Sequence, residues 1–309
     1  MFRSSNSADL DTILAFANAE PVGWTDAGRY RRELATNNYR DHWTWIAEAS
    51  GYPMARAIWW APSGADHPVA LDCLLVKPSV KQPEELAAGL LKAGHEAFKA
   101  AGATTLPDYT IDVAVGWHED PRAMEAVAWR RRAAECAGLE SFIERVNFEW
   151  TPGTVLPVPV HDLDYRTGTD QEFKTAFARA AEGSLDAQTR NNLAIMGPRG
   201  QAQDDLEFYL SLPGERAAWR LAFVPSGTPI GFIIPTRTAY DASVSYVGVY
   251  PDQRGHGYIH ELLGEITRVH AASGVPRITG TTDLDNAPML AAFERAGYCI
   301  IKRRLVLTA

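Results

Sequence analysis

Clustered cysteines are missing from this sequence. Its three cysteines, Cys73, Cys136 and Cys299, lie far apart and form neither a CxxC pair nor a group with histidines. This spacing argues against a disulfide framework and against a cysteine-based zinc site. We therefore expect reduced, buried thiols in a cytoplasmic protein that binds no metal.

Long apolar runs and an excess of basic residues are also missing. No stretch approaches the about 18 consecutive apolar residues of a membrane-spanning helix, and residues 1–16 lack the basic and apolar segments of a signal peptide. The 30 Lys and Arg are outnumbered by 38 Asp and Glu, which gives a net charge of −8. Because nucleic acids and anionic membranes attract basic faces, we expect neither as a partner.

The composition is that of a folded globular chain, with 46% hydrophobic and 22% charged residues. Its 309 residues are about twice the commonest domain length. The segment "TPGTVLPVPVHD", residues 151–162, is rich in proline, which favours extended chain and excludes a helix. We therefore expect two domains, residues 1–150 and 163–309, joined by a linker over 151–162.

The two halves share a faint internal similarity. "AAECAGLESF" in the first half matches "AAFERAGYCI" in the second, so that Ala137-Gly138 falls on Ala296-Gly297. "VKPSVKQPEELAAGLL" matches "VYPDQRGHGYIHELL" through Val76, Pro78 and Leu90. Because these matches occur in the same order, the sequence suggests a duplicated fold.

The second half alternates between strand-like and helix-like patterns. Apolar runs bounded by Gly and Pro predict strands, and apolar residues at helical spacing predict helices. The fold class expected from this alternation is α/β. The predicted strands are 217–224, 230–238, 242–251, 277–283 and 298–307, and the predicted helices are 259–274 and 287–297.

A glycine-rich turn joins one of these strands to a helix, in "VGVYPDQRGHGYIHELL", residues 247–263. A helix N-terminus has unpaired N–H groups and a partial positive charge, and glycine lets an anion approach the backbone closely. Neither a P-loop nor a dinucleotide-binding fingerprint fits the spacing. The turn is therefore an anion site of another kind, or a turn that uses glycine only for its geometry.

The surrounding motifs decide between these two readings. "VYPDQRGHGYI" resembles the V-x-P-x-x-R-G-x-G-x-G/A motif of the GNAT superfamily of acyl-CoA-dependent N-acyltransferases, and "NAPMLAAFERAGY" resembles that superfamily's N-x-x-(hydrophobic)…A-G-F/Y segment. The resemblance covers residues 163–309 well and the first half in outline. It looks like the tandem, two-domain members common in actinobacteria. It implies two GNAT-type domains, each a mixed, mostly antiparallel sheet flanked by helices, with acetyl-CoA or another acyl-CoA as cosubstrate.

The resemblance also implies roles for particular residues. The backbone of Val247 and Val249 would pair with the pantetheine arm. Asn286 would contact the pantetheine, and Phe293 would lie near the thioester sulfur. The backbone amides of a continuous segment would cradle the pyrophosphate: Arg254, Gly255, His256, Gly257, Tyr258 and Ile259.

The catalytic residues are less evident. Phe293 stands where many members of the superfamily carry a tyrosine that protonates the leaving thiolate, and the strand 242–251 offers no glutamate base. Tyr246 and Asp241 are the nearest candidates for the proton transfer that an amine nucleophile requires. An ordinary strand aromatic and an ordinary turn residue are the alternative explanations for these two.

The first half has lost the glycine-rich turn. "KQPEE", residues 81–85, stands at the corresponding place, where Pro83 removes an amide donor and Glu84 and Glu85 would repel a pyrophosphate. We therefore expect a single acyl-CoA site, in the C-terminal domain, and a degenerate N-terminal domain.

The expected activity is transfer of an acetyl or other small acyl group from acyl-CoA to an amine of a small molecule, by direct attack in a ternary complex. A catalytically weak or inactive CoA-binding pseudoenzyme, with a sensing or scaffolding role, is one alternative. An aminoacyl-tRNA-dependent transferase is another, although the acidic charge disfavours it. Because two domains of one fold can mimic a dimer, we expect a monomer or a weak homodimer.

Overall fold

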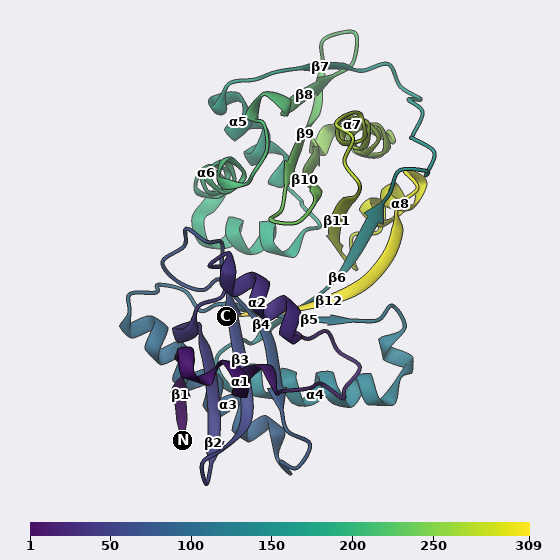
Figure 1. Ribbon diagram of the computed structural model, residues 1–309. Coiled ribbons are helices and arrows are strands. Elements are labelled where there is room, and N and C mark those ends of the chain that lie inside the picture. The colour runs from purple at the N-terminus through teal and green to yellow at the C-terminus, as the bar shows by residue number, and fades with distance from the viewer. The chain divides into compact units, whose positions relative to one another are not determined.

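The computed structural model describes all 309 residues and divides into two compact units. The first unit contains Met1–Glu144 and Lys302–Ala309, and the second contains Arg145–Ile301. Each unit is a sheet flanked by helices (Figure 1).

The sheet of the first unit is mixed and mostly antiparallel. Its strands follow the chain order β1, β2, β3, β4, β5, and part of β12 lies beside β5. Only β4 and β5 are parallel. The strands are β1 Phe2–Ser4, β2 Thr44–Ala49, β3 Tyr52–Trp60, β4 Ala70–Val76, β5 Asp108–Val113 and β12 Cys299–Thr308; the α-helices are α1 Leu10–Leu14, α2 Ala27–Ala35, α3 Pro83–Ala100 and α4 Pro121–Cys136.

The second unit repeats this arrangement. Its strand order is β7, β8, β9, β10, β11, β6, and only β10 and β11 are parallel. The predicted fold class, two tandem mixed sheets of GNAT type, is confirmed. The strands are β6 Ser141–Trp150, β7 Asp164–Arg166, β8 Arg220–Phe223, β9 Pro229–Arg237, β10 Ala242–Val249 and β11 Ile278–Asp283; the α-helices are α5 Asp170–Ala181, α6 Ala187–Ser211, α7 Tyr258–Ala272 and α8 Ala287–Arg295. Short 3-10 helices cover Ser7–Asp9, Asp41–Trp43, Trp117–Glu119, Arg216–Ala218 and Pro251–Gln253.

The last strand of each sheet comes from an unexpected part of the chain. β6 follows α4 in sequence, yet its residues 145–150 pair with β11 of the second unit. β12 follows α8, yet its residues 303–307 pair with β5 of the first unit. The units therefore differ from the predicted domains 1–150 and 163–309. Proline content marks irregular chain, whereas strand pairing determines which residues share a sheet.

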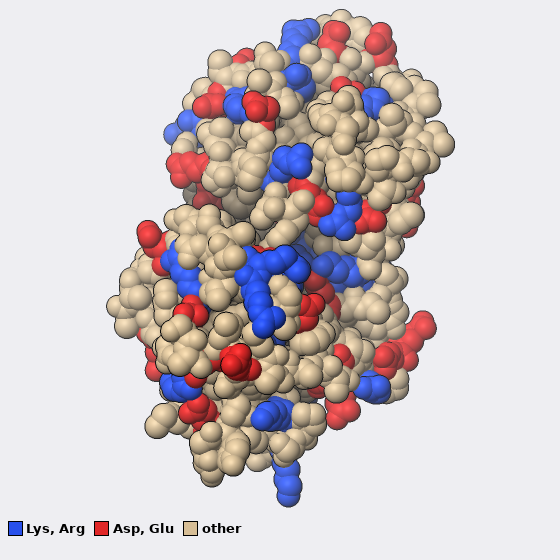
Figure 2. Space-filling view, in the orientation of Figure 1, with Lys and Arg blue, Asp and Glu red and all other residues tan.

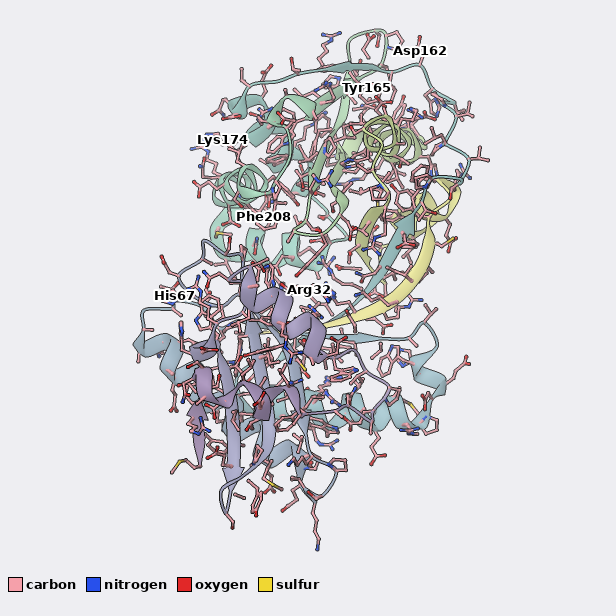
Figure 3. All side chains as sticks on the ribbon, viewed as in Figure 1. Arg32, His67, Asp162, Tyr165, Lys174 and Phe208 are labelled. Carbon is pink, nitrogen blue, oxygen red and sulfur yellow. The ribbon has the colours of Figure 1, made fainter.

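The proline-rich segment 151–162 is irregular, as its composition predicts, apart from one isolated bridge between Pro152 and Thr154. It does not join the two units, because both of its ends belong to the second unit. It lies along α7, where Arg268 donates to the Pro157 carbonyl at 2.7 Å and the Val160 amide donates to Glu261 Oε1 at 2.9 Å. Asp162, labelled in Figure 3, marks its end.

Helices cover both faces of the second sheet. α7 and α8 lie on one side of β10 and β11, and α5 and α6 lie on the other (Figure 1). Two separate cores result, because strand residues alternate between faces. Leu262, Ile266 and Phe293 are buried on the α7 and α8 side, and Phe177 and Leu206 on the α5 and α6 side.

Candidate functional site

The second sheet opens between its two parallel strands. β10 and β11 pair only at Ala242 with Ile278, Ser243 with Thr279, and Val244 with Gly280. The pairing of β10 with β9 shifts register at Ser245, and such a bulge bends a strand. Beyond it β10 stays with β9, while β11 stays with β6 as far as Asp283. The two strands diverge, and the unpaired edge of each faces the opening.

The edge of β10 offers backbone hydrogen bonds to this opening. Tyr250 donates its amide to the Ile230 carbonyl at 2.9 Å, so Tyr250 faces β9. Since backbone groups alternate in direction along an antiparallel strand, Gly248 also faces β9, and Val247 and Val249 face the opening. These are the two residues that the sequence assigned to an extended ligand. The Val249 carbonyl already accepts from Arg254 Nε at 3.3 Å, so at this residue the amide is the group that remains to bind a ligand.

The glycine-rich turn forms a cradle of free backbone donors. Gly255 and Gly257 have φ of +82° and +80°, which glycine adopts without strain. None of the amides of residues 255–259 donates to another group of the protein, and no side chain caps α7. Five consecutive N–H groups at a helix N-terminus fit an anionic diphosphate.

Arg254 has a different task from the one its sequence position suggests. Its guanidinium donates to the Ala180 carbonyl at 2.9 Å and the Gly183 carbonyl at 3.0 Å, at the end of α5, and its amide donates to the Pro251 carbonyl at 3.3 Å. The last carbonyls of a helix lack intrahelical partners and attract a cation. The cradle therefore begins at Gly255, and Arg254 holds the turn against α5.

The other side chains of the turn leave the cradle clear. The exposed His256 ring places Nδ1 3.0 Å from the Arg254 carbonyl. Tyr258 packs its ring edge to face with that of His161, with centroids 5.2 Å apart. Ile259, bulkier than the residue usual at this place, turns into the core beneath α7. Its side chain therefore does not obstruct the amides.

Helix α8 places Asn286 and Phe293. Asn286 caps the helix through an Oδ1 that accepts from the Met289 amide at 3.4 Å, which leaves Nδ2 as a donor. Phe293 is 1% exposed and stacks on Phe148 with centroids 4.5 Å apart. A Cβ on Gly280 would lie 2.5 Å from its ring, so Phe293 packs where the strands begin to part.

The two predicted catalytic residues lie in different surroundings. Asp241 accepts two hydrogen bonds from Arg277, at 2.9 and 2.6 Å, before the paired end of β10. Both carboxylate oxygens are therefore engaged, which argues against a role as base.

Tyr246 follows the bulge and points toward α5 and α6, where it contacts the rings of Phe177 and Tyr209 with centroids 5.5 and 5.3 Å away. Burial raises the pKa of Tyr246 well above its ordinary value, and the charges of Asp205 and Asp186 raise it further. The hydroxyl therefore stays protonated at neutral pH, so it cannot act as a base.

Sequence reasoning did not identify Asp205 on α6. Its side chain is half-buried and accepts a hydrogen bond from Gln201, which is completely buried. Burial raises the pKa of Asp205 to about 7. In the sequence Asp205 is one of several acids on a polar stretch, so nothing local distinguishes it.

The corresponding opening in the first unit is filled by the protein itself. β4 and β5 pair only at Ala70 with Asp108 and at Leu71 with Tyr109. Arg130, 1% exposed, donates to the Leu74 carbonyl at 3.2 Å and to Glu20 at 2.6 Å.

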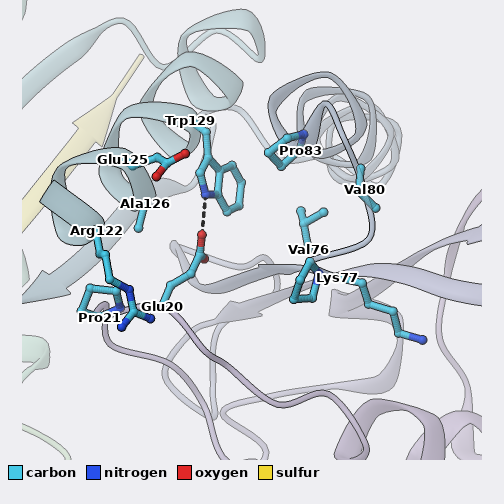
Figure 4. Close-up of a pocket in the computed structure, with 11 residues that line it drawn as sticks. Glu20, Pro21, Val76, Lys77, Val80, Pro83, Arg122, Glu125, Ala126 and Trp129 are labelled. Atoms are coloured by element: carbon cyan, nitrogen blue, oxygen red, sulfur yellow. Dashed lines mark hydrogen bonds between the residues drawn. The ribbon is translucent and has the colours of Figure 1, made fainter.

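Glu20 also accepts from the Trp129 indole at 2.9 Å (Figure 4). A pocket of about 220 Å³ remains, and Lys77, Pro83 and Arg122 are among its lining residues. In the first unit, the Arg130 side chain thus occupies the strand edge whose counterpart is open in the second unit.

Comparison with known proteins agrees with this geometry. Residues 195–298 match the model of the acetyltransferase (GNAT) family. A GCN5-related N-acetyltransferase from Sphaerobacter thermophilus is similar over 100% of this chain and 95% of its own, with 19% identity and a TM-score of 0.56.

A GCN5-related glucosamine N-acetyltransferase region of a fungal GH3 β-N-acetylglucosaminidase is similar over 99% of this chain and 38% of that protein, with 14% identity and a TM-score of 0.54. At these identities the likeness concerns the fold.

No helix has the length and apolar character needed to cross a membrane. The family match covers the opening between β10 and β11 and the cradle at the start of α7. The second unit repeats the sheet order of the first. Residues 195–298, which lie in the second unit, are therefore an acetyltransferase (GNAT) family domain, and the first unit repeats the order of its sheet.

Proposed function

We propose that this protein transfers an acetyl or other small acyl group from acyl-CoA to an amine of a small molecule, by direct attack in a ternary complex. The observation that carries the proposal is the row of free amides at residues 255–259, beside the open edge of β10. Acyl-CoA supplies an activated thioester carbonyl. The protein supplies the binding and the orientation.

Different residues of the site could bind successive parts of an acyl-CoA molecule. The amides of Gly255 to Ile259 would hold the diphosphate, and the backbone of Val247 and the amide of Val249 would pair with the amide-containing arm. Asn286 Nδ2 offers one more donor. The reacting end would then lie where β10 and β11 part, near Phe293.

Catalysis at this place depends largely on positioning. Holding two reactants in line removes about 7 kcal/mol or more of the barrier. Phe293 cannot supply a proton, whereas the Tyr246 hydroxyl stays protonated and lies just after the bulge. Tyr246 is therefore the described side chain best suited to protonate the departing sulfur.

Basic and acidic side chains are interspersed over the second unit on the face shown in Figure 2. With a net charge of −8, this favours a small acceptor over a tRNA, whose binding depends on neutralising many phosphates.

Calorimetry with acetyl-CoA tests the site. The double change Gly255→Glu, Gly257→Glu should abolish binding, because it places two carboxylates and two strained residues in the cradle. The matched control, Glu84→Gln with Glu85→Gln at the start of α3, should leave the affinity unchanged. Binding that survives in the glycine variant, or is lost in the control, would contradict the proposal.

Thiol release from acetyl-CoA in the presence of amines tests the reaction. Release that depends on the amine supports the proposed transfer. Saturable binding of acetyl-CoA without thiol release for any amine would favour a CoA-binding pseudoenzyme. Phe293 motivates this alternative, because phenylalanine cannot protonate the leaving thiolate.

A further inference from the structure

Helix α6 lies on the side of the opening toward which Tyr246 points. Asp283, at the end of β11, accepts from the Ala187 amide at 2.6 Å, and Asp186 caps the helix through the Thr189 amide at 2.8 Å. Thr189 donates its hydroxyl to Asp186 Oδ1 at 3.0 Å. The first turn of α6 is thus attached to the end of β11. An acceptor that approaches from this side meets α6.

The second part of α6 brings an acid to the same place. A kink at Gly197, whose φ of +69° is not helical, divides α6 into two helical segments, and the second contains Asp205 and Tyr209. The Tyr209 ring lies 5.3 Å from that of Tyr246, and the charge of Asp205 acts on both hydroxyls. We call Asp186, Gln201, Asp205, Tyr209 and Tyr246 the α6 cluster.

The α6 cluster is acidic and has spare hydrogen-bonding capacity. Arg145 lies beside this cluster, and its guanidinium forms ion pairs with both Asp186 at 2.8 Å and Asp283 at 2.8 Å. Asp205 forms no ion pair and accepts only from Gln201, whose own buried Oε1 has no partner. A site with unpaired negative charge favours a cation, and it disfavours a ligand that carries a carboxylate.

We propose that Asp205 accepts a proton from the ammonium group of the acceptor, and that the α6 cluster selects small primary amines without a carboxylate beside the amine. This inference rests on the proposed acyl transfer. The ammonium gives one proton to Asp205, and the neutral nitrogen forms the new C–N bond as the C–S bond breaks. Tyr246 gives its proton to the departing sulfur, and the second proton lost by the nitrogen then returns to the Tyr246 oxygen.

The ionisation of Asp205 suits this task. Burial is the main cause of its raised pKa of about 7; the charges of Asp204 and Asp186 raise it further, and the hydrogen bond from Gln201 lowers it. A base works best when its pKa is close to the working pH. Because the carboxylate form is needed, kcat/KM should rise with pH through about 7.

The test compares matched acceptors by thiol release from acetyl-CoA. Tyramine and tyrosine, and agmatine and arginine, differ only in the carboxylate beside the single primary amine; spermidine and glucosamine complete the panel. We expect kcat/KM at least about 10-fold higher for the amine of each pair. Asp205→Asn should lower kcat/KM by about 100-fold or more and remove the rise with pH, while acetyl-CoA binding stays intact.

Variants at two neighbouring acids on α6 test the inference without changing Asp205. Asp204→Asn removes a charge that raises the pKa of Asp205, so the rise should move to lower pH. Glu207→Gln, on the exposed surface of the same helix, should leave it in place. The three variants should also bind acetyl-CoA as the wild type does, which shows that each is folded.

The outcomes separate this inference from the proposed function. Unchanged activity and pH profile in Asp205→Asn, a rise that Asp204→Asn does not move, or equal use of amines and amino acids would overturn the inference alone. Binding of acetyl-CoA without thiol release for any acceptor would overturn both.

Discussion

At the scale of single residues, the opening depends on the absence of a side chain at Gly280. The Phe293 ring occupies the space that a Cβ would need, at 2.5 Å. Glycine there lets the strand pass close to the ring, and the pairing of β10 with β11 ends at this residue. The large ring of Phe293 therefore requires that residue 280 has no side chain.

Gly280→Ala should destabilise the protein by about 1–3 kcal/mol, because the added methyl group overlaps the ring. Urea unfolding measures the change. Gly64→Ala is the control, since no atom lies within 4 Å of its Cβ position. Combining Gly280→Ala with Phe293→Leu should recover part of the loss, and strict additivity of the two changes would contradict this explanation.

At the scale of elements, the cradle is held in place by α5. Arg254 joins the turn to the carbonyl end of that helix instead of pointing into the cradle. It is therefore a positioning residue whose charge lies outside the proposed diphosphate site.

Arg254→Gln should weaken acetyl-CoA binding severalfold by loosening the turn, and it should leave the salt dependence of binding unchanged. Calorimetry over a range of salt concentrations measures both quantities. A direct contact with phosphate would give a different result, because losing it would make binding less sensitive to salt.

The elements also show what sequence patterns can and cannot predict. The strands and helices of residues 217–307 follow from local periodicity, and the cradle follows from Gly255 and Gly257 at the start of a helix. Local patterns do not predict α6, because Gly197 and Pro198 interrupt it; the structure has two helical segments that meet at Gly197. Asp205 was missed with it, since its role depends on packing against distant residues.

At the scale of the whole molecule, neither sheet is made from one continuous segment. Residues 303–307 complete the sheet of the first unit, and residues 145–150 complete that of the second. Such pairing leaves no mark on local composition, which explains why the proline-rich segment 151–162 suggested a boundary that the sheets do not follow.

Deleting residues 302–309 should destabilise the first unit, although these residues are distant in sequence from the rest of that unit. The deletion removes the partner of β5 and the ion pairs of Asp112 with Lys302 and with Arg304, the latter at 2.7 Å. Hydrogen exchange should show lost protection in β5 and β4. Protection lost only within residues 145–301 would contradict the strand assignment.

The order of synthesis gives this arrangement a further consequence. The ribosome makes β5 before the second unit and residues 303–307 after it, so the β5 edge is open while the second unit is synthesised. An open strand edge invites pairing with other chains. Until residues 303–307 are made, the β5 edge is therefore exposed to such pairing.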